Sequence, residues 1–168
     1  MHRPTLAPSD VSFDVFNVAA MRSAHMLYLM RQGYGLFITL TIGGTPSPAE
    51  AKRRLGLWSA QIDHGVLGRS YQRHPQFRMR YTAIPEKLAG HWHYHLGAIP
   101  PQPASGPLTR SEFEFICWAA WSAECPNGAF HFRTVDNQLE MARYMTKSLR
   151  DEAVLENIVH STEFHPIS

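Results

Sequence analysis

The chain is 168 residues long, 44% hydrophobic and 18% charged, with a formal net charge of +2. This composition is typical of one globular domain, and the length is too short for a large second module such as a motor ATPase. Because the net charge is small, a nucleic-acid surface would have to come from local clusters of the 16 Lys and Arg residues, chiefly those at 51–56 and 69–80.

Cys117 and Cys125 are the two cysteines, and they form no CxxC pair, which argues against a disulfide framework or a zinc knuckle. The first ten residues, MHRPTLAPSD, do not have the pattern of a signal peptide, and no apolar run reaches membrane-spanning length. The sequence therefore predicts a cytoplasmic protein with no membrane partner.

Periodicity, capping residues and turn residues predict eight elements along the chain. They are a helix from the Ser9 or Asp10 cap to Gly33, a strand at 34–44, a helix from Ser47 to Ile62, strands at 77–87 and 91–99, a helix at 111–124, a strand at 128–136 and a helix at 137–154. Ser47 with Glu50, and Thr109 with Glu112, have the spacing of capping boxes. The aromatic residues of the helix at 111–124 are expected in the core.

This order of elements predicts an α+β fold, with a central antiparallel sheet and flanking helices, rather than a doubly wound parallel sheet. No GxGxxG or GxxxxGK[ST] motif indicates nucleotide binding. We expect one domain over 1–168, with an N-terminal helical extension at 1–33, a core at 34–150 and a tail at 151–168. The proline-rich stretch at 100–107 is expected to be a surface loop inside that domain.

The stretch GHWHYHLGAIP places His91, His93 and His95 at every second position. Alternation is the period of a strand, so the three imidazoles are predicted to share one face. Side chains two residues apart lie about 7 Å apart, and two rings turned toward each other can bind one ion. A single histidine in such a place is usually structural, but two or three in register favour a metal site.

On the last predicted helix, Glu140, Tyr144, Lys147 and Ser148 lie opposite the apolar arc of Met141, Ala142, Met145 and Leu149. A tyrosine there is usually a half-buried amphipathic residue. Its hydroxyl, with an ordinary pKa near 10, is a poor nucleophile unless a cation or metal lies beside the group it attacks. Lys147 and an ion on the histidine strand would supply those charges.

Three segments together resemble the HUH endonucleases of rolling-circle replication, the Rep initiators of plasmids and of single-stranded DNA phages and viruses. FITLTI (37–42) is similar to their first strand motif, HYHL (93–96) to the metal-binding His-hydrophobic-His motif, and YMTK (144–147) to the Tyr-x-x-Lys motif. The resemblance covers 37–149, about two-thirds of the chain. It implies an HUH or RRM-like fold, a variant of the ferredoxin-like arrangement.

The resemblance also implies a function: site-specific nicking and joining of single-stranded DNA at an origin or hairpin, which initiates rolling-circle replication of a plasmid or phage. Tyr144 would form a 5′-phosphotyrosine, Lys147 would orient or neutralise the phosphate, and His93 and His95 would hold Mn²⁺ or Mg²⁺. The host replication machinery would be a partner. Because one tyrosine lies on the helix, the cycle would be completed by a second subunit, as in a homodimer, or by another nucleophile.

The third metal ligand is either Glu86 or His91. Glu86 occupies the place just before the histidine strand where family members often have an acidic or polar residue, and a carboxylate suits Mg²⁺ and Mn²⁺. His91 is predicted on the same face as His93 and His95. Arg78, Arg80 and Arg143 are the candidate DNA-binding residues.

Three alternatives stay open. Single-tyrosine transposases and plasmid relaxases use similar parts, although relaxases tend to place the tyrosine before the histidines, whereas Tyr144 follows them. A non-catalytic nucleic-acid-binding module would use basic runs with interleaved aromatics, such as RSYQRHPQFRMR at 69–80. A metallohydrolase would use the histidines to activate water and would form no protein–DNA adduct. The chain is expected to be either a minimal nuclease or a piece of a longer protein, because typical Rep proteins carry further domains.

Overall fold

The structure, a computed structural model, describes residues 11–88, 91–150 and 152–165. Its helices and strands are α1 (Val11–Arg31), β1 (Leu36–Ile42), α2 (Pro48–Leu67), β2 (Arg80–Leu88), β3 (His91–Ile99), α3 (Arg110–Glu124), β4 (Ala129–Thr134), α4 (Gln138–Met145), α5 (Glu152–Leu155) and β5 (Val159–His160). Short 3-10 turns follow α2 and β5. The predicted Ser9 or Asp10 cap lies outside the described residues.

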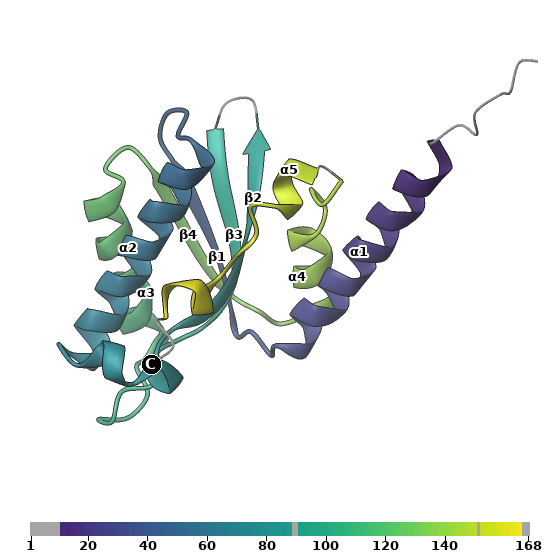
Figure 1. Ribbon diagram of the computed structural model, residues 1–168. Helices are drawn as coiled ribbons and strands as arrows, with labels where there is room; N and C mark the ends of the chain where they lie inside the picture. The colour runs from purple at the N-terminus through teal and green to yellow at the C-terminus, as the bar shows by residue number, and fades with distance from the viewer. Residues whose placement is uncertain (1–10, 89–90, 151, 166–168) are drawn as a thin grey trace, which may run out of the picture.

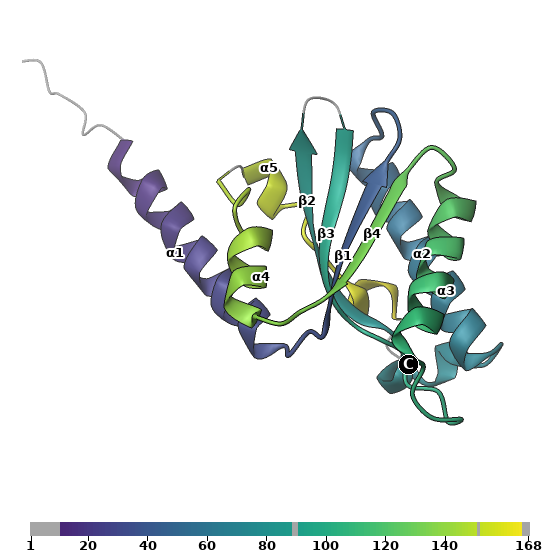
Figure 2. The ribbon, with the colours of Figure 1, turned by 180° about the vertical axis from the view of Figure 1, so that it is seen from behind.

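The strands form one five-stranded sheet in the order β4-β1-β3-β2-β5, and every neighbouring pair is antiparallel. Figures 1 and 2 show α2 and α3 on one side of this sheet and α4, α5 and α1 on the other. The predicted α+β class, an antiparallel sheet flanked by helices, is confirmed. Among the described residues, no helix is both long enough and apolar enough to cross a membrane.

Strand alternation gives the sheet two different faces. Ile38 and Leu40 of β1 point into the larger core, which also contains Trp58 of α2 and Trp121 of α3. Phe37, one residue away from Ile38, belongs instead to a second, smaller core that includes residues of α1 and α4. The sheet is therefore packed on both sides, with the larger apolar cluster under α2 and α3.

Capping residues act largely as the sequence predicts. Thr109 and Glu112 form a reciprocal capping box at the start of α3. Ser47 accepts a hydrogen bond from the Glu50 backbone N–H, but the Glu50 carboxylate binds two arginines of α2 instead of returning to the cap. The first cap is thus confirmed, while its second, reciprocal hydrogen bond is replaced by ion pairs.

Helix α2 is longer than predicted, because it runs to Leu67 rather than ending at Ile62. The extra turn places Asp63 in the interior, where its carboxylate accepts hydrogen bonds from Arg78 and from the Met79 backbone. The helix then ends at Gly68, whose φ of +78° is a left-handed conformation that glycine adopts without steric cost. Helical periodicity could not predict this turn, because it treats Asp63 as an exposed residue and contains no information about hydrogen-bond partners that lie further along the chain.

The single helix predicted at 137–154 is wrong, because α4 ends at Met145 and a turn separates it from α5. The Thr146 hydroxyl donates to the Ala142 carbonyl, and the Lys147 N–H bonds to the carbonyl of Tyr144, three residues back. These contacts tighten and end the helix. Lys147 therefore lies just beyond α4 rather than on it.

The aromatic residues of α3 are divided between core and surface. Phe113 and Trp121 are buried as expected, but Phe115 and Trp118 are 64% and 50% exposed. The expectation that all of them lie in the core is therefore only half confirmed. The two exposed rings contact each other, with centroids 5.8 Å apart.

Candidate active site

The second face of the sheet carries a row of polar side chains where β1 and β3 pair. Thr39 lies opposite His95, and Thr41 lies opposite His93. The Thr39 hydroxyl is 3.1 Å from His95 Nδ1, and the Thr41 hydroxyl is 2.8 Å from His93 Nδ1. Both imidazoles are thus fixed through Nδ1, which directs each Nε2 away from β1.

Glu86 joins this row from the neighbouring strand. It lies in β2 directly opposite His93, and its Oε2 is 2.7 Å from Nε2 of His95. The sequence predicts Glu86 near the end of the strand at 77–87, and β2 extends one residue further, through Leu88. Its position is set by strand pairing, which holds the carboxylate on the same face as the two histidines.

Tyr144 covers the row from α4 and is 41% exposed. Its ring centroid is 5.0 Å from that of His95 and 5.5 Å from that of Phe37, both edge to face. The Lys147 Nζ lies 4.0 Å from the Tyr144 ring centroid and 3.1 Å from Glu86 Oε2. Tyrosine, lysine, glutamate and histidine are therefore in one continuous set of contacts.

The charges in this set follow from burial and hydrogen bonding. Burial lowers the pKa of His95 and of His93, and attraction by Glu86 offsets only part of that effect. Burial alone would raise the pKa of Glu86, but hydrogen bonds from His95 and Lys147 outweigh it and the pKa is lowered. Near neutral pH, Glu86 is therefore a carboxylate, and both histidines are uncharged.

These charges also determine which nitrogen of His95 carries the proton. A carboxylate only accepts hydrogen bonds, so His95 Nε2 carries the proton that it shares with Glu86, and Nδ1 accepts from the Thr39 hydroxyl. A hydroxyl can also accept, so the tautomer can reverse without loss of this hydrogen bond. The reversed tautomer leaves Nε2 unprotonated, which is the form that binds a metal ion.

Lys147 is a cation held beside the tyrosine. Burial alone would lower the pKa of its ammonium group, but hydrogen bonds to Glu86 and Tyr144 outweigh this and raise the pKa. The lysine is therefore charged at neutral pH. A fixed positive charge at this position attracts an anionic group brought to the tyrosine hydroxyl.

The donor chemistry of this face fits a divalent ion. His93, His95 and Glu86 offer two imidazoles and one carboxylate on that face, and His95 Nε2 lies 2.7 Å from Glu86 Oε2. Imidazole and carboxylate together suit Mn²⁺ and also Mg²⁺. Within the described residues, however, no group of three or more His, Cys, Asp or Glu side chains is already gathered as a complete metal site.

The two candidates for a third ligand differ in placement. Glu86 contacts His95 directly, whereas His91 lies at the exposed beginning of β3, paired with Leu88 in β2. His91 shares the face with His93 by alternation, as predicted. The structure thus brings Glu86 together with His95 and leaves His91 at the rim.

The three candidate DNA-binding arginines are not brought together. The prediction for Arg78 is wrong, since its side chain is buried and donates to Asp63 at 2.7 Å and to the Phe164 carbonyl at 3.1 Å. Arg80 is exposed at the start of β2, beside a different cavity, and Arg143 is exposed on α4. Burying the charged guanidinium group of an arginine costs free energy unless an opposite charge is buried with it, and the carboxylate of Asp63 provides that charge for Arg78.

Sequence reasoning missed two residues of β4 near Tyr144. A cavity of about 240 Å³ beside the tyrosine is lined in part by His131 and Arg133. The Arg133 guanidinium carbon lies 4.6 Å from the centroid of Phe37 and 5.9 Å from that of Tyr144. Their alternation in AFHFRT, like that of Thr39 and Thr41 in FITLTI, is the signal that could have placed them on the histidine face.

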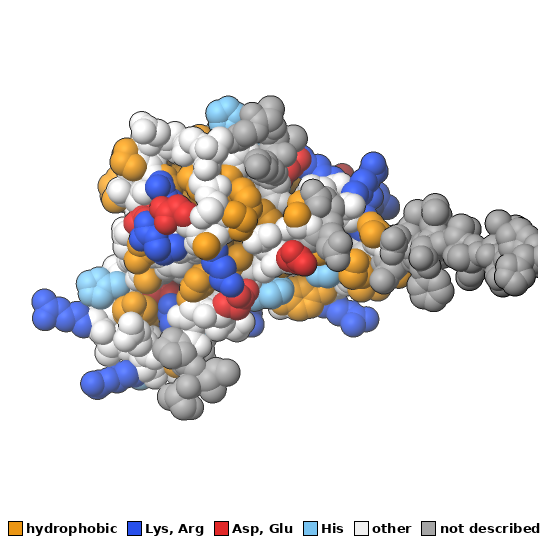
Figure 3. All heavy atoms as spheres, turned by 45° about the horizontal axis from the view of Figure 1, so that its top comes forward, with side chains coloured by type: hydrophobic (Ala, Val, Ile, Leu, Met, Phe, Trp, Pro, Cys, Tyr) orange, Lys and Arg blue, Asp and Glu red, His pale blue; other side chains and the backbone are white. Residues whose placement is uncertain are grey.

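Comparison of the chain with protein-family models, with curated proteins and with solved structures gives no match. The arrangement of side chains therefore carries the functional argument. In Figure 3, acidic and basic side chains lie interspersed over the face that is shown, which gives no reason to infer a path for DNA from charge on that face.

Proposed function

We propose that this protein is a metal-dependent endonuclease of the HUH type, which nicks and rejoins single-stranded DNA through Tyr144. The observation that carries the proposal is the contact set of Tyr144, Lys147, Glu86 and His95 on one face of the sheet. A half-exposed tyrosine hydroxyl beside a fixed cation and an imidazole–carboxylate pair has the parts that phosphoryl transfer needs.

In the proposed reaction, the Tyr144 oxygen attacks the phosphorus of one phosphodiester. A new bond forms between phosphorus and the tyrosine oxygen, while the bond from phosphorus to the 3′ oxygen breaks. The phenolic proton passes to solvent, to which Tyr144 is open, and the leaving 3′ oxygen takes a proton. The products are a 5′-phosphotyrosine and a free 3′-hydroxyl, and attack by a 3′-hydroxyl reverses the step.

Other side chains orient the phosphate and balance its charge. Lys147 attracts the phosphate oxygens and offsets their negative charge beside Tyr144. Arg133 supplies a second positive charge 5.9 Å from the Tyr144 ring centroid, at the cavity lined by β4. Both cations lie within 5.9 Å of the Tyr144 ring centroid, so both can attract a phosphate brought to the hydroxyl.

His93, His95 and Glu86 are the residues that would hold Mn²⁺ or Mg²⁺. Such an ion, when bound, polarises the phosphate oxygens and offsets charge in the transition state. Thr39 and Thr41 hold both imidazoles through Nδ1, and the opposite nitrogen of His95 contacts Glu86. Initiation of rolling-circle replication on a plasmid or phage, with host replication proteins as partners, is the biological role that this chemistry fits.

The decisive test is a covalent adduct. The protein is incubated with Mn²⁺ and single-stranded oligonucleotides from its own replicon, labelled at the 3′ end, and then run on a denaturing gel. We expect a labelled protein–DNA band that is absent with EDTA and absent for Tyr144→Phe. Tyr71→Phe, which removes a hydroxyl far along the chain from α4, is the matched control and should keep the band.

The outcomes separate the competing functions. Cleavage without an adduct would mean that water is the nucleophile and would replace the proposal with a metallohydrolase. Binding without cleavage, equal for the wild-type protein and Tyr144→Phe, would favour a non-catalytic nucleic-acid-binding module. A single-tyrosine transposase or relaxase would also form the adduct, and cleavage of transposon-end or transfer-origin oligonucleotides instead of replication origins would identify it.

A further inference from the structure

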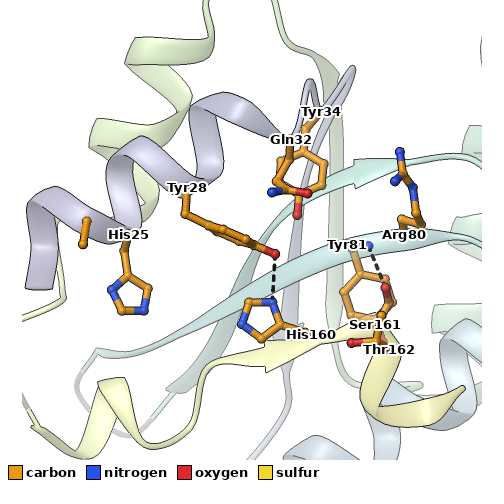
Figure 4. A pocket seen from close by; sticks show the side chains of 10 residues that line it. His25, Tyr28, Gln32, Tyr34, Arg80, Tyr81, His160, Ser161 and Thr162 are labelled. Carbon is orange, nitrogen blue, oxygen red and sulfur yellow. Dashed lines mark hydrogen bonds between the residues drawn. The ribbon is translucent and has the colours of Figure 1, made fainter. Parts of the chain in front are cut away.

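A second cavity, of about 440 Å³, lies between the C-terminal part of α1 and the β5 edge of the sheet (Figure 4). Helix α1 contributes His25 and Tyr28, and the turn after it contributes Gln32, whereas the sheet edge contributes Arg80 and His160. The volume is in the range of small-molecule sites. No residue of the candidate active site lines this cavity among those that the structure describes.

The cavity beside Tyr144 and the second cavity lie toward opposite edges of the sheet, although β2 contributes Glu86 to the candidate active site and Arg80 to the second cavity. The cavity beside Tyr144 is lined by β1 and β4, and β4 is one edge strand, whereas His160 belongs to β5 at the other edge. Between them lies the smaller core, to which Ile84 and Met145 belong. The second cavity therefore requires an explanation of its own.

The chemistry of the walls favours an anion. Arg80, His25 and His160 line the cavity, and no Asp or Glu does so within the described part of the chain. The Ser161 and Thr162 hydroxyls lie in the same wall and can donate hydrogen bonds. A guanidinium group with nearby hydroxyl donors is a common arrangement for binding a phosphate group.

The aromatic side chains also leave a planar surface. Tyr28 is 39% exposed, and its ring lies edge to face with His160, with centroids 5.5 Å apart. An edge-to-face contact occupies the rim of one ring and leaves a ring face open for stacking. Gln32, in the turn directly after α1, carries an amide that can both donate to and accept from the edge of a base.

Hydrogen bonds hold the walls in place. The Tyr34 hydroxyl is 2.8 Å from Thr82 Oγ1, which is 3.1 Å from His160 Nδ1. On the opposite wall, His25 Nδ1 donates to the Met21 carbonyl at 2.9 Å, so its Nε2 is the nitrogen left for a ligand. The pocket is thus preformed, which limits the entropy lost on binding.

We propose that this cavity is a nucleotide-binding site, in which the base stacks on Tyr28 and contacts Gln32 while Arg80 binds the phosphate. The nucleotide has two sources, a free mononucleotide or one residue of a single strand held by the protein. The site does not depend on chemistry at Tyr144, so its test is separate from that of the proposed function.

The experiment titrates the intact protein with each deoxynucleoside 5′-monophosphate and with oligonucleotides of increasing length. Calorimetry gives the affinity, and the side-chain NMR signals of His25 and His160 report the place of binding. We expect Tyr28→Ala, Gln32→Ala and Arg80→Ala each to weaken binding about tenfold or more. Arg69→Ala, an exposed arginine after α2, is the matched control and should bind like the wild-type protein.

Each outcome is decisive. Binding of monophosphates that perturbs His25 and His160 and is weakened by the three variants establishes a free-nucleotide site. The same perturbation with oligonucleotides alone establishes that the strand supplies the base. Histidine signals that neither probe perturbs, or equal binding of inorganic phosphate, would overturn the proposal.

Discussion

The two faces of the sheet are built from the same strands but differ in composition and in what they contact. One face, formed by residues such as Ile38 and Leu40, is covered by α2 and α3 and contains the larger core. The other carries Thr39, Thr41 and the histidines, partly covered by α4. Each strand contributes to both faces by alternation. Neighbouring residues of one strand therefore have different roles: substitutions on the apolar face should change stability, and substitutions on the polar face should change the proposed activity.

The largest expected effect is on the apolar face. Trp58 is fully buried, and its Nε1 donates to the Cys117 carbonyl at 3.0 Å. Trp58→Ala should lower the free energy of unfolding by about 3–5 kcal/mol, because it leaves a cavity. Denaturant unfolding measures the loss, and Trp58→Phe provides a milder variant if Trp58→Ala does not fold.

On the polar face, we expect a substitution to change activity and leave stability nearly unchanged. Tyr144→Phe keeps the half-exposed ring and removes only the hydroxyl, so the free energy of unfolding should change by about 0.5 kcal/mol or less. DNA-adduct formation should be lost for Tyr144→Phe and kept by the folded fraction of Trp58→Phe. If Tyr144→Phe lowers the free energy of unfolding as much as the Trp58 variant does, the two faces do not have the separate roles inferred for them.

A second large effect concerns the buried pair of Asp63 and Arg78. Arg78→Ala leaves Asp63 buried with only the Met79 N–H, and burial already raises the pKa of that carboxyl. We expect a loss of about 3–5 kcal/mol in the free energy of unfolding. Arg143→Ala, on the exposed side of α4, is the control, with an expected change of about 0.5 kcal/mol or less. A small loss for Arg78→Ala would argue against the buried position.

An intermediate effect is expected from the threonines that hold the histidines. Thr39→Val and Thr41→Val remove the hydroxyl partner of each Nδ1 and should lower Mn²⁺ affinity by about 10- to 100-fold, as measured by calorimetry. Thr134→Val, at the exposed end of β4, should bind Mn²⁺ as the wild-type protein does. Unchanged affinity in both variants would mean that the threonines do not position the ligands.

The smallest expected effect is a pH dependence of stability. Burial, helped by the nearby charge of Arg78, lowers the pKa of His165 from 6.5 to about 4. The unfolded state binds the proton more readily, so the stabilisation is complete above pH 6.5 and is lost as the pH falls toward about 4. Because His165 is only partly buried, we expect about 1 kcal/mol. Unfolding measured across this range should show a smaller slope for His165→Gln than for the control His74→Gln.

Much of the fold could be predicted because the signals are local. Alternation in HWHYHLGAI defines β3, and Thr109 with Glu112 marks the start of α3 through contacts three residues apart. The end of α4 could not be predicted from periodicity, since the apolar arc continues to Leu149 while Thr146 ends the helix through its own hydroxyl. The exposure of Phe115 and Trp118 was likewise hidden, because apolar residues covered most of α3.

The sequence by itself determined which side chains share a face. Strand alternation groups His93 with His95, and the spacing of Tyr144 and Lys147 holds them together even though the helix ends between them. These relations depend on the backbone period, which each segment carries by itself.

Only the tertiary structure decided which segments meet. Pairing of β2 with β3 places Glu86 opposite His93, and packing of α1 brings Tyr28 within 3.5 Å of His160, 132 residues away. The same packing buries Arg78 against Asp63. Strand register and helix docking depend on burial of the whole apolar surface, a quantity that no short stretch of sequence contains.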